Sequence, residues 1–300
     1  MSWRFQLLAK PYGSITEGPV WDGEFVYFTH IPSSRIMAFN PKTGIINEWR
    51  TDTNHTNGLA FDVQGRLYGC CAGGRSIVRF ENDGSTTIIG DKLHGLRLNT
   101  PNDLAIDSTG RIWFTNPWNE GNTGATEREE LDHKSVLLAN PRSDGSYTIT
   151  QATFDTTMPN GILISPDEHT LYVAESNNDM SIPGRELRAY PINSDGSLAP
   201  YTVLHTFGRD TRSTQRGIDG MCFDSEGNIV ATAGWELGGP GPMVYVFSPS
   251  GRVLETHPTP AVRPTNCCFG GPDMTDLYIT TSQGHLFRVQ TQRSGWALYP

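Results

Sequence analysis

Glu17-Gly-Pro-Val-Trp21 is the first of six segments that share one pattern, in which an oxygen-bearing side chain heads a run typical of a β-strand. The five later copies are Asn57-Gly-Leu-Ala-Phe61, Asn102-Asp-Leu-Ala-Ile106, Asn160-Gly-Ile-Leu-Ile164, Asp219-Gly-Met-Cys-Phe223 and Asn266-Cys-Cys-Phe-Gly270. We call the first residue of each copy the motif head. Copies at intervals of roughly 40 to 60 residues indicate a repeated structural unit.

Each repeat continues with a turn and then with further segments typical of strands. In the third repeat, the turn Asp107-Ser-Thr-Gly110 leads into Arg111-Ile-Trp-Phe114, which is rich in residues that suit a pleated surface. Ser135-Val-Leu-Leu138 follows, and Asp144-Gly145 is typical of the hairpin before a fourth strand. Six such repeats predict an all-β fold, a six-bladed β-propeller with four-stranded antiparallel blades, formed by residues 1–300 as a single domain.

The last repeat lacks a clear fourth strand of its own. Phe5-Gln-Leu-Leu-Ala9 precedes Glu17 at a spacing like that of the fourth strands before the other motif heads, so we expect it to close the last blade. Strand one leaves the face of the motif heads and strand two returns to it. The loops between second and third strands should therefore rim the same mouth of the channel, the longest being 116–134, 176–185 and 234–242.

Composition and charge exclude several classes of protein. The formal net charge of −9 argues against nucleic-acid binding. No apolar stretch approaches the roughly 20 residues of a membrane span, and no signal peptide is evident, so we expect a cytoplasmic protein that does not bind membranes. The adjacent pairs Cys70-Cys71 and Cys267-Cys268 favour small buried residues over disulfides. The run Glu127-Arg-Glu-Glu130 is typical of a solvated face.

The motif heads would meet around one axis if the repeats close into a ring. Glu17, Asn102, Asn160 and Asp219 would then offer two carboxylates and two amide carbonyls, which are hard oxygen ligands for one divalent cation. Turn capping is the alternative explanation for any single Asn or Asp. Two carboxylates facing each other across a narrow channel would repel without an ion. We therefore expect one bound divalent metal, calcium first, with zinc, magnesium and manganese as alternatives.

These segments resemble the superfamily of senescence marker protein (regucalcin), gluconolactonase and luciferin-regenerating enzyme. The resemblance runs from about Glu17 to Val289 and rests on Glu17-Gly-Pro-Val-Trp21, Thr100-Pro-Asn-Asp-Leu104, Met158-Pro-Asn-Gly-Ile162, Gly217-Ile-Asp-Gly-Met221 and Pro264-Thr-Asn266. Members are six-bladed propellers with one divalent metal in the channel. The resemblance implies metal ligation by Glu17, Asn160 and Asp219, with Asn102 as a fourth ligand or a near neighbour.

The activity implied by the resemblance is metal-dependent hydrolysis of a lactone to a hydroxy acid, with Asp219 as the catalytic base. The expected substrate-binding residues are Asn102, Trp118, Glu120, His30, His133 and Trp235. A purely structural or solvated role is the alternative for each mouth residue. Three positions differ from the family pattern: Thr100 replaces an Arg of regucalcin, His30 an Asp of many members, and Asn116 an Asp common in gluconolactonase-like members.

Two other functions stay open at this point. One is hydrolysis of another ester or of an organophosphorus bond, because diisopropylfluorophosphatase is similar in architecture and in its oxygen-ligand metal. The other is a non-catalytic propeller that binds calcium or a partner protein. The expected partner is a small lactone or ester. The sequence leaves open the particular lactone, the physiological metal, the oligomeric state, and whether Asn57 and Asn266 contact metal or substrate.

Overall fold

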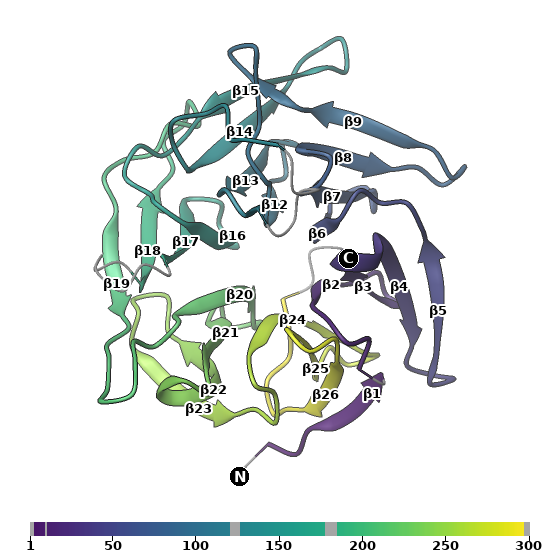
Figure 1. Ribbon diagram of the computed structural model, residues 1–300, viewed down its shortest axis with the longest axis vertical. Helices are drawn as coiled ribbons and strands as arrows, with labels where there is room; N and C mark the ends of the chain where they lie inside the picture. The colour runs from purple at the N-terminus through teal and green to yellow at the C-terminus, as the bar shows by residue number, and fades with distance from the viewer. Residues whose placement is uncertain (1–2, 10, 121–126, 178–184, 297–300) are drawn as a thin grey trace.

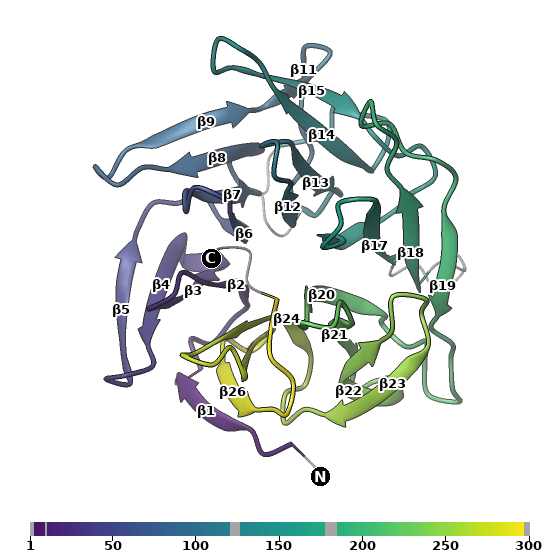
Figure 2. The ribbon, with the colours of Figure 1, turned by 180° about the vertical axis from the view of Figure 1, so that it is seen from behind.

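The fold is a closed ring of six four-stranded antiparallel sheets, seen along the ring axis in Figure 1 and from behind in Figure 2. The computed structural model describes residues 3–9, 11–120, 127–177 and 185–296. In each blade the first strand lies nearest the axis and the fourth lies at the rim (Figure 1). The predicted six-bladed β-propeller is confirmed.

The strands follow the chain in regular order. From the axis outward, the first three blades are β2 Thr16–Trp21, β3 Val26–His30, β4 Arg35–Asn40 and β5 Ile45–Arg50; β6 Thr56–Phe61, β7 Leu67–Cys71, β8 Ser76–Phe80 and β9 Thr86–Gly90; and β12 Leu104–Ile106, β13 Ile112–Asn116, β14 Ser135–Pro141 and β15 Tyr147–Gln151. The last three are β16 Pro159–Ile164, β17 Thr170–Ser176, β18 Arg185–Pro191 and β19 Thr202–Thr206; β20 Ile218–Phe223, β21 Ile229–Trp235, β22 Gly238–Phe247 and β23 Val253–Pro258; and β24 Pro264–Gly270, β25 Asp276–Thr281, β26 Leu286–Gln290 and β1 Gln6–Ala9.

Two short elements interrupt the repeat. A 3-10 helix, η1 Ile31–Ser33, follows β3, and a small hairpin of β10 Lys92–Leu93 and β11 Leu96–Arg97 lies between the second and third blades. Within the described residues, no helix has the length and apolar character needed to cross a membrane.

The N-terminal strand completes the last blade. β1 pairs antiparallel with β26, and Gln6 lies opposite Arg288 in this pairing. Ala9 is buried in a cluster that also contains Phe28 of the first blade and Tyr278 of the last. The predicted closure is confirmed, and it ties the start of the chain to its final sheet.

The hydrophobic core lies between neighbouring blades. One cluster joins Tyr68 and Ile77 of the second blade to Phe114 and Leu137 of the third. Equivalent clusters lie between other neighbouring blades, so each sheet is held on both faces. The five cysteines are unpaired by disulfides, as predicted.

Close approach of the first strands explains the glycine that follows most motif heads. A Cβ on Gly161 would lie 2.4 Å from the carbonyl oxygen of Asp219 in the next blade, and a Cβ on Gly58 would lie 2.7 Å from that of Asn102. Only a residue without a side chain fits so near a neighbouring backbone. The glycine therefore lets the heads of adjacent blades come together.

The prediction of a long loop at 234–242 is wrong. β21 and β22 extend into a hairpin there, and Trp235 lies opposite Gly238. Gly234 and Gly239 have positive φ, and the register shifts between Ala233 and Trp235, so these glycines bend a strand pair. Of the other two loops, residues 121–126 and 178–184 lie outside the described residues.

Candidate functional site

The motif heads lie at one end of the central channel, at or near the starts of the first strands. Glu17 and Asp219 are buried, while Asn102 and Asn160 are partly exposed. Asn160 Nδ2 donates a hydrogen bond to Asp219 Oδ1 at 2.8 Å, which joins the fourth and fifth blades. The Gly18 N–H donates to Glu17 Oε2 at 2.9 Å. The structure thus brings Asn160 and Asp219 into direct contact.

Three carboxyl groups share the channel: Glu17, Asp219 and Asp103, which was not predicted. Burial raises the pKa of Glu17 well above its usual range, and the charges of Asp219 and Asp103 raise it further. Burial also raises the pKa of Asp103 to about 7. Such mutual repulsion in a buried space is relieved when a cation lies among the carboxylates.

The donor set fits a hard divalent cation. Asn57 Oδ1 is buried and accepts no hydrogen bond from the described residues, whereas the buried Asp219 Oδ2 has Arg216 Nη1 2.8 Å away. Carboxylate and amide oxygens are the ligands that calcium and magnesium prefer. Within the described part of the chain, no three His, Cys, Asp or Glu side chains form a cluster able to hold an ion by themselves. A metal site here therefore needs amide oxygens, and Asn160 supplies one if its amide turns over.

Two arginines beside the acidic cluster were also missed. Arg216 Nη1 lies 2.8 Å from Asp219 Oδ2. Burial lowers the pKa of Arg263, and so does the charge of Arg216, while Asp219 and Glu17 act in the opposite direction. Both arginines stand three residues before a motif head. This repeated position is visible in the sequence, but a charged residue there is more simply interpreted as a solvated side chain.

Trp118 lies on the mouth loop that follows β13. The guanidinium of Arg75 lies 5.3 Å from the centre of its ring, a cation–π contact. Arg75 is 1% exposed, and its Nη1 lies 3.0 Å from Glu127 Oε2. Glu130 also pairs with Arg75, at 3.6 Å. Residues 127–130 are exposed, as predicted for a solvated face, and the carboxylates of Glu127 and Glu130 also tie the loop to the buried Arg75.

The two predicted histidines lie at strand ends near the mouth. His30 ends β3, and its Nδ1 lies 2.5 Å from Ser33 Oγ. Burial lowers the pKa of His30, as does the charge of Arg35, and both effects favour the neutral ring. His133 precedes β14, and its Nδ1 lies 2.7 Å from Ser135 Oγ. Contact of either ring with substrate stays a prediction.

The remaining mouth residues differ in their exposure. Trp235 Nε1 donates to the Thr214 carbonyl at 3.0 Å, and Glu120 is exposed. Thr100, which replaces the Arg of regucalcin, donates to the Pro117 carbonyl at 2.8 Å. Thr100 therefore fixes the start of the mouth loop. The substrate-binding roles of Trp235 and Glu120 stay predictions.

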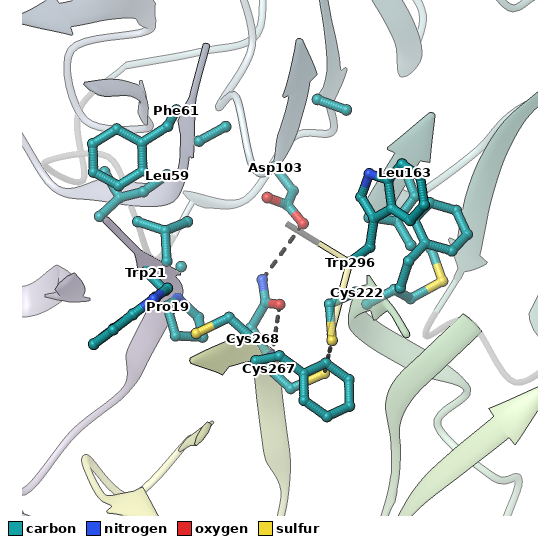
Figure 3. Close-up of a pocket in the computed structure, with 18 of the residues that line it drawn as sticks. Pro19, Trp21, Leu59, Phe61, Asp103, Leu163, Cys222, Cys267, Cys268 and Trp296 are labelled. Carbon is teal, nitrogen blue, oxygen red and sulfur yellow. Dashed lines mark hydrogen bonds between the residues drawn. The ribbon is translucent and has the colours of Figure 1, made fainter. Parts of the chain in front are cut away.

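The opposite end of the channel is an apolar cavity of about 390 Å³. Its lining includes Trp21, Phe61 and Trp296 (Figure 3). Asp103 and Asn266 form a polar part of the lining, with Asn266 Nδ2 3.4 Å from Asp103 Oδ2. Most of the lining residues follow the motif heads along the first strands, so this cavity lies beyond the carboxyl cluster.

The architecture and the residues at the channel mouth define a propeller of the lactonase-like class. Residues 15–283 match the family model described as the SMP-30/Gluconolactonase/LRE-like region. The chain belongs to this family, which confirms the predicted resemblance.

Relatives with known names cover nearly the whole chain. A gluconolactonase of Zymomonas mobilis is 29% identical over 302 residues, spanning 93% of this chain and 79% of the relative. A 6-deoxy-6-sulfogluconolactonase of Pseudomonas putida is 25% identical over 293 residues, spanning 94% and 87%. The solved structure of a gluconolactonase from Xanthomonas campestris gives a TM-score of 0.78 at 29% identity, covering 96% of this chain and 89% of that one.

Proposed function

We propose that this chain hydrolyses a lactone at the motif-head end of its channel. The observation that carries the proposal is the convergence of Glu17, Asn160 and Asp219 at that end, with the Asp219 carboxylate buried between Asn160 and Arg216. The names of the relatives from Zymomonas mobilis and Xanthomonas campestris support a sugar-acid lactone as substrate.

Asp219 is the residue placed to act as general base. Asn160 donates to its Oδ1, and Oδ2, which pairs with Arg216, keeps a second lone pair to accept a proton from a water molecule. The oxygen of that water attacks the lactone carbonyl carbon. The ring C–O bond then breaks, the released alkoxide takes up a proton, and a hydroxy acid is formed. Arg216, 2.8 Å from Oδ2, stabilises negative charge at this place.

A divalent cation fits this mechanism. Glu17, Asn160 and Asp219 would hold it, with Asn102 as a fourth ligand or a substrate contact. Calcium is the first candidate, and zinc, magnesium and manganese also suit oxygen ligands. When bound, such an ion polarises a carbonyl group and stabilises the developing oxyanion. The side chains Trp118, Glu120, His30, His133 and Trp235 would border the substrate at the mouth.

A screen of lactones in a pH-stat, with and without a chelator, tests this function. Asp219→Asn should fold normally yet lose turnover by about 100-fold or more. Asp273→Asn, the same change at an exposed site far along the chain, should retain full activity. Full turnover by Asp219→Asn would exclude it as the base. Hydrolysis of phosphofluoridates alone would replace the lactone by an organophosphorus substrate.

Metal binding can be measured without turnover. Titration calorimetry of calcium into the metal-free protein should show one site, and Glu17→Gln should weaken it because a carboxylate ligand is lost. Unaltered affinity in Glu17→Gln would exclude Glu17 as a ligand.

A further inference from the structure

Arg216 and Arg263 occupy the same place in two neighbouring repeats. Each precedes its motif head, Asp219 or Asn266, by three residues and stands just before the first strand of its blade, β20 or β24. The equivalent residues of the other four repeats are uncharged: Ser14, Asn54, Asn99 and Thr157. In a propeller, equal repeat positions lie at equal height around the axis. The pair therefore places two guanidinium groups on one side of the channel mouth.

Of these two arginines, Arg216 has an ion-pair partner among the described residues and Arg263 has none. Arg216 is 9% exposed and, among the described residues, makes a single ion pair, with Asp219. Arg263 makes no ion pair with the described residues, and its Nε is buried without a hydrogen bond from them. Each guanidinium carries five N–H donors. A partly buried cation without an acceptor, next to a second cation, is costly unless an anion joins them.

We propose that Arg216 and Arg263 bind an anionic substituent of the substrate, so that the preferred lactones carry a carboxylate, phosphate or sulfonate besides the ester. This inference rests on the proposed lactonase function and names its substrate class. Guanidinium groups bind such anions with two parallel hydrogen bonds, which gives both energy and orientation. The anion would fix the substrate beside Asp219, because Arg216 contacts that carboxylate directly.

The same arginines could instead only balance Glu17, Asp103 and Asp219. That alternative makes a different prediction. A balancing role affects fold stability or metal affinity, but it gives no preference between a charged and an uncharged substrate. A recognition role changes the preference itself.

The test compares matched hydroxy acids as ligands, which separates binding from turnover. We expect D-gluconate 6-phosphate or D-glucarate to bind about tenfold or more tightly than D-gluconate by titration calorimetry, with metal-free and calcium-loaded protein. Comparing D-gluconate 6-phosphate with D-glucarate shows whether the site prefers a phosphate or a carboxylate. Arg263→Gln should remove most of this preference, and Arg263→Lys should retain part of it.

Arg212→Gln is the matched control, because Arg212 is an exposed arginine of the same segment that already pairs with Asp210 at 2.7 Å. It should leave the preference within about twofold. Equal affinity for charged and uncharged ligands in the unaltered protein would overturn the proposal, and so would an unchanged preference in a folded Arg263→Gln variant. Anion binding without hydrolysis of any lactone would refute the lactonase function and leave the anion site standing.

Discussion

Gly161→Ala tests whether close contact of the first strands assembles the candidate site. Gly161 follows the motif head Asn160, and an added Cβ would lie 2.4 Å from the Asp219 carbonyl oxygen and 3.1 Å from Gly220 Cα. Ordinary contacts begin at 3.4 Å, so β16 and β20 must separate by about 1 Å. The backbone of the next blade cannot move aside as a flexible side chain would. Both strands are anchored in packed sheets.

The expected cost follows from this clash. Overpacking costs about 1–3 kcal/mol, and the lower freedom of alanine in the unfolded chain offsets about 0.4–1 kcal/mol of it. A net loss of about 1.5 kcal/mol corresponds to a fall in Tm of about 2–3 °C for a chain of 300 residues. The separation would also stretch the Asn160–Asp219 hydrogen bond of 2.8 Å. We therefore expect turnover and metal affinity to fall together.

Differential scanning calorimetry measures the change in Tm, and Gly208→Ala provides the control. A Cβ on Gly208 meets no atom within 4 Å, and its φ is not positive, so this variant should melt at the unaltered temperature or slightly above it. If Gly161→Ala has the same Tm as Gly208→Ala and retains full turnover, contact between the first strands does not assemble the site.

Two further predictions concern the stability of the ring. Deleting residues 1–9 removes β1 from the last blade and exposes the edge of β26, so the Tm should fall by several degrees; an unchanged melt would contradict the role of this pairing in stability. Burial lowers the pKa of His205 in the folded state, so the unfolded chain binds more protons below pH 6.5 and the free energy of unfolding should fall as the pH drops from 7 to 5. His205→Gln should weaken that dependence in urea titrations, and an identical slope would refute this contribution.

The sequence predicted the fold because repetition carries more information than any single strand. Six equal patterns with turns between them are compatible with few folds. In a closed ring, the six motif heads must face one axis. The direct contact of Asn160 with Asp219 followed from that geometry. Closure by the N-terminal strand was predictable for the same reason, since one blade lacked a strand.

Residues outside the repeat pattern were harder to predict. Asp103 occupies a place where four repeats have glycine, so the motif alone does not indicate a buried acid there. Arg216 and Arg263 precede strands, where a charged residue usually faces water. Their burial depends on which blades are neighbours, a property of the closed ring. The glycines of 234–242 indicated a loop because glycine permits both turns and bent strands.

Hydrogen bonds between blades explain why like charges can remain together at the channel mouth. Thr265 Oγ1 donates to the Thr16 carbonyl at 2.7 Å across the junction of the last and first blades, and Thr29 Oγ1 donates to the Asn57 carbonyl at 2.9 Å across the next one. Blades tied in this way cannot spread to relieve repulsion between Glu17 and Asp219. The responses left to the site are to take up a proton, as the raised pKa of Glu17 indicates, or to bind positive charge from an arginine of the chain or from a cation. Because the ring cannot widen, repulsion between the buried carboxylates increases the affinity of the site for positive charge. The Arg216 guanidinium already supplies part of that charge.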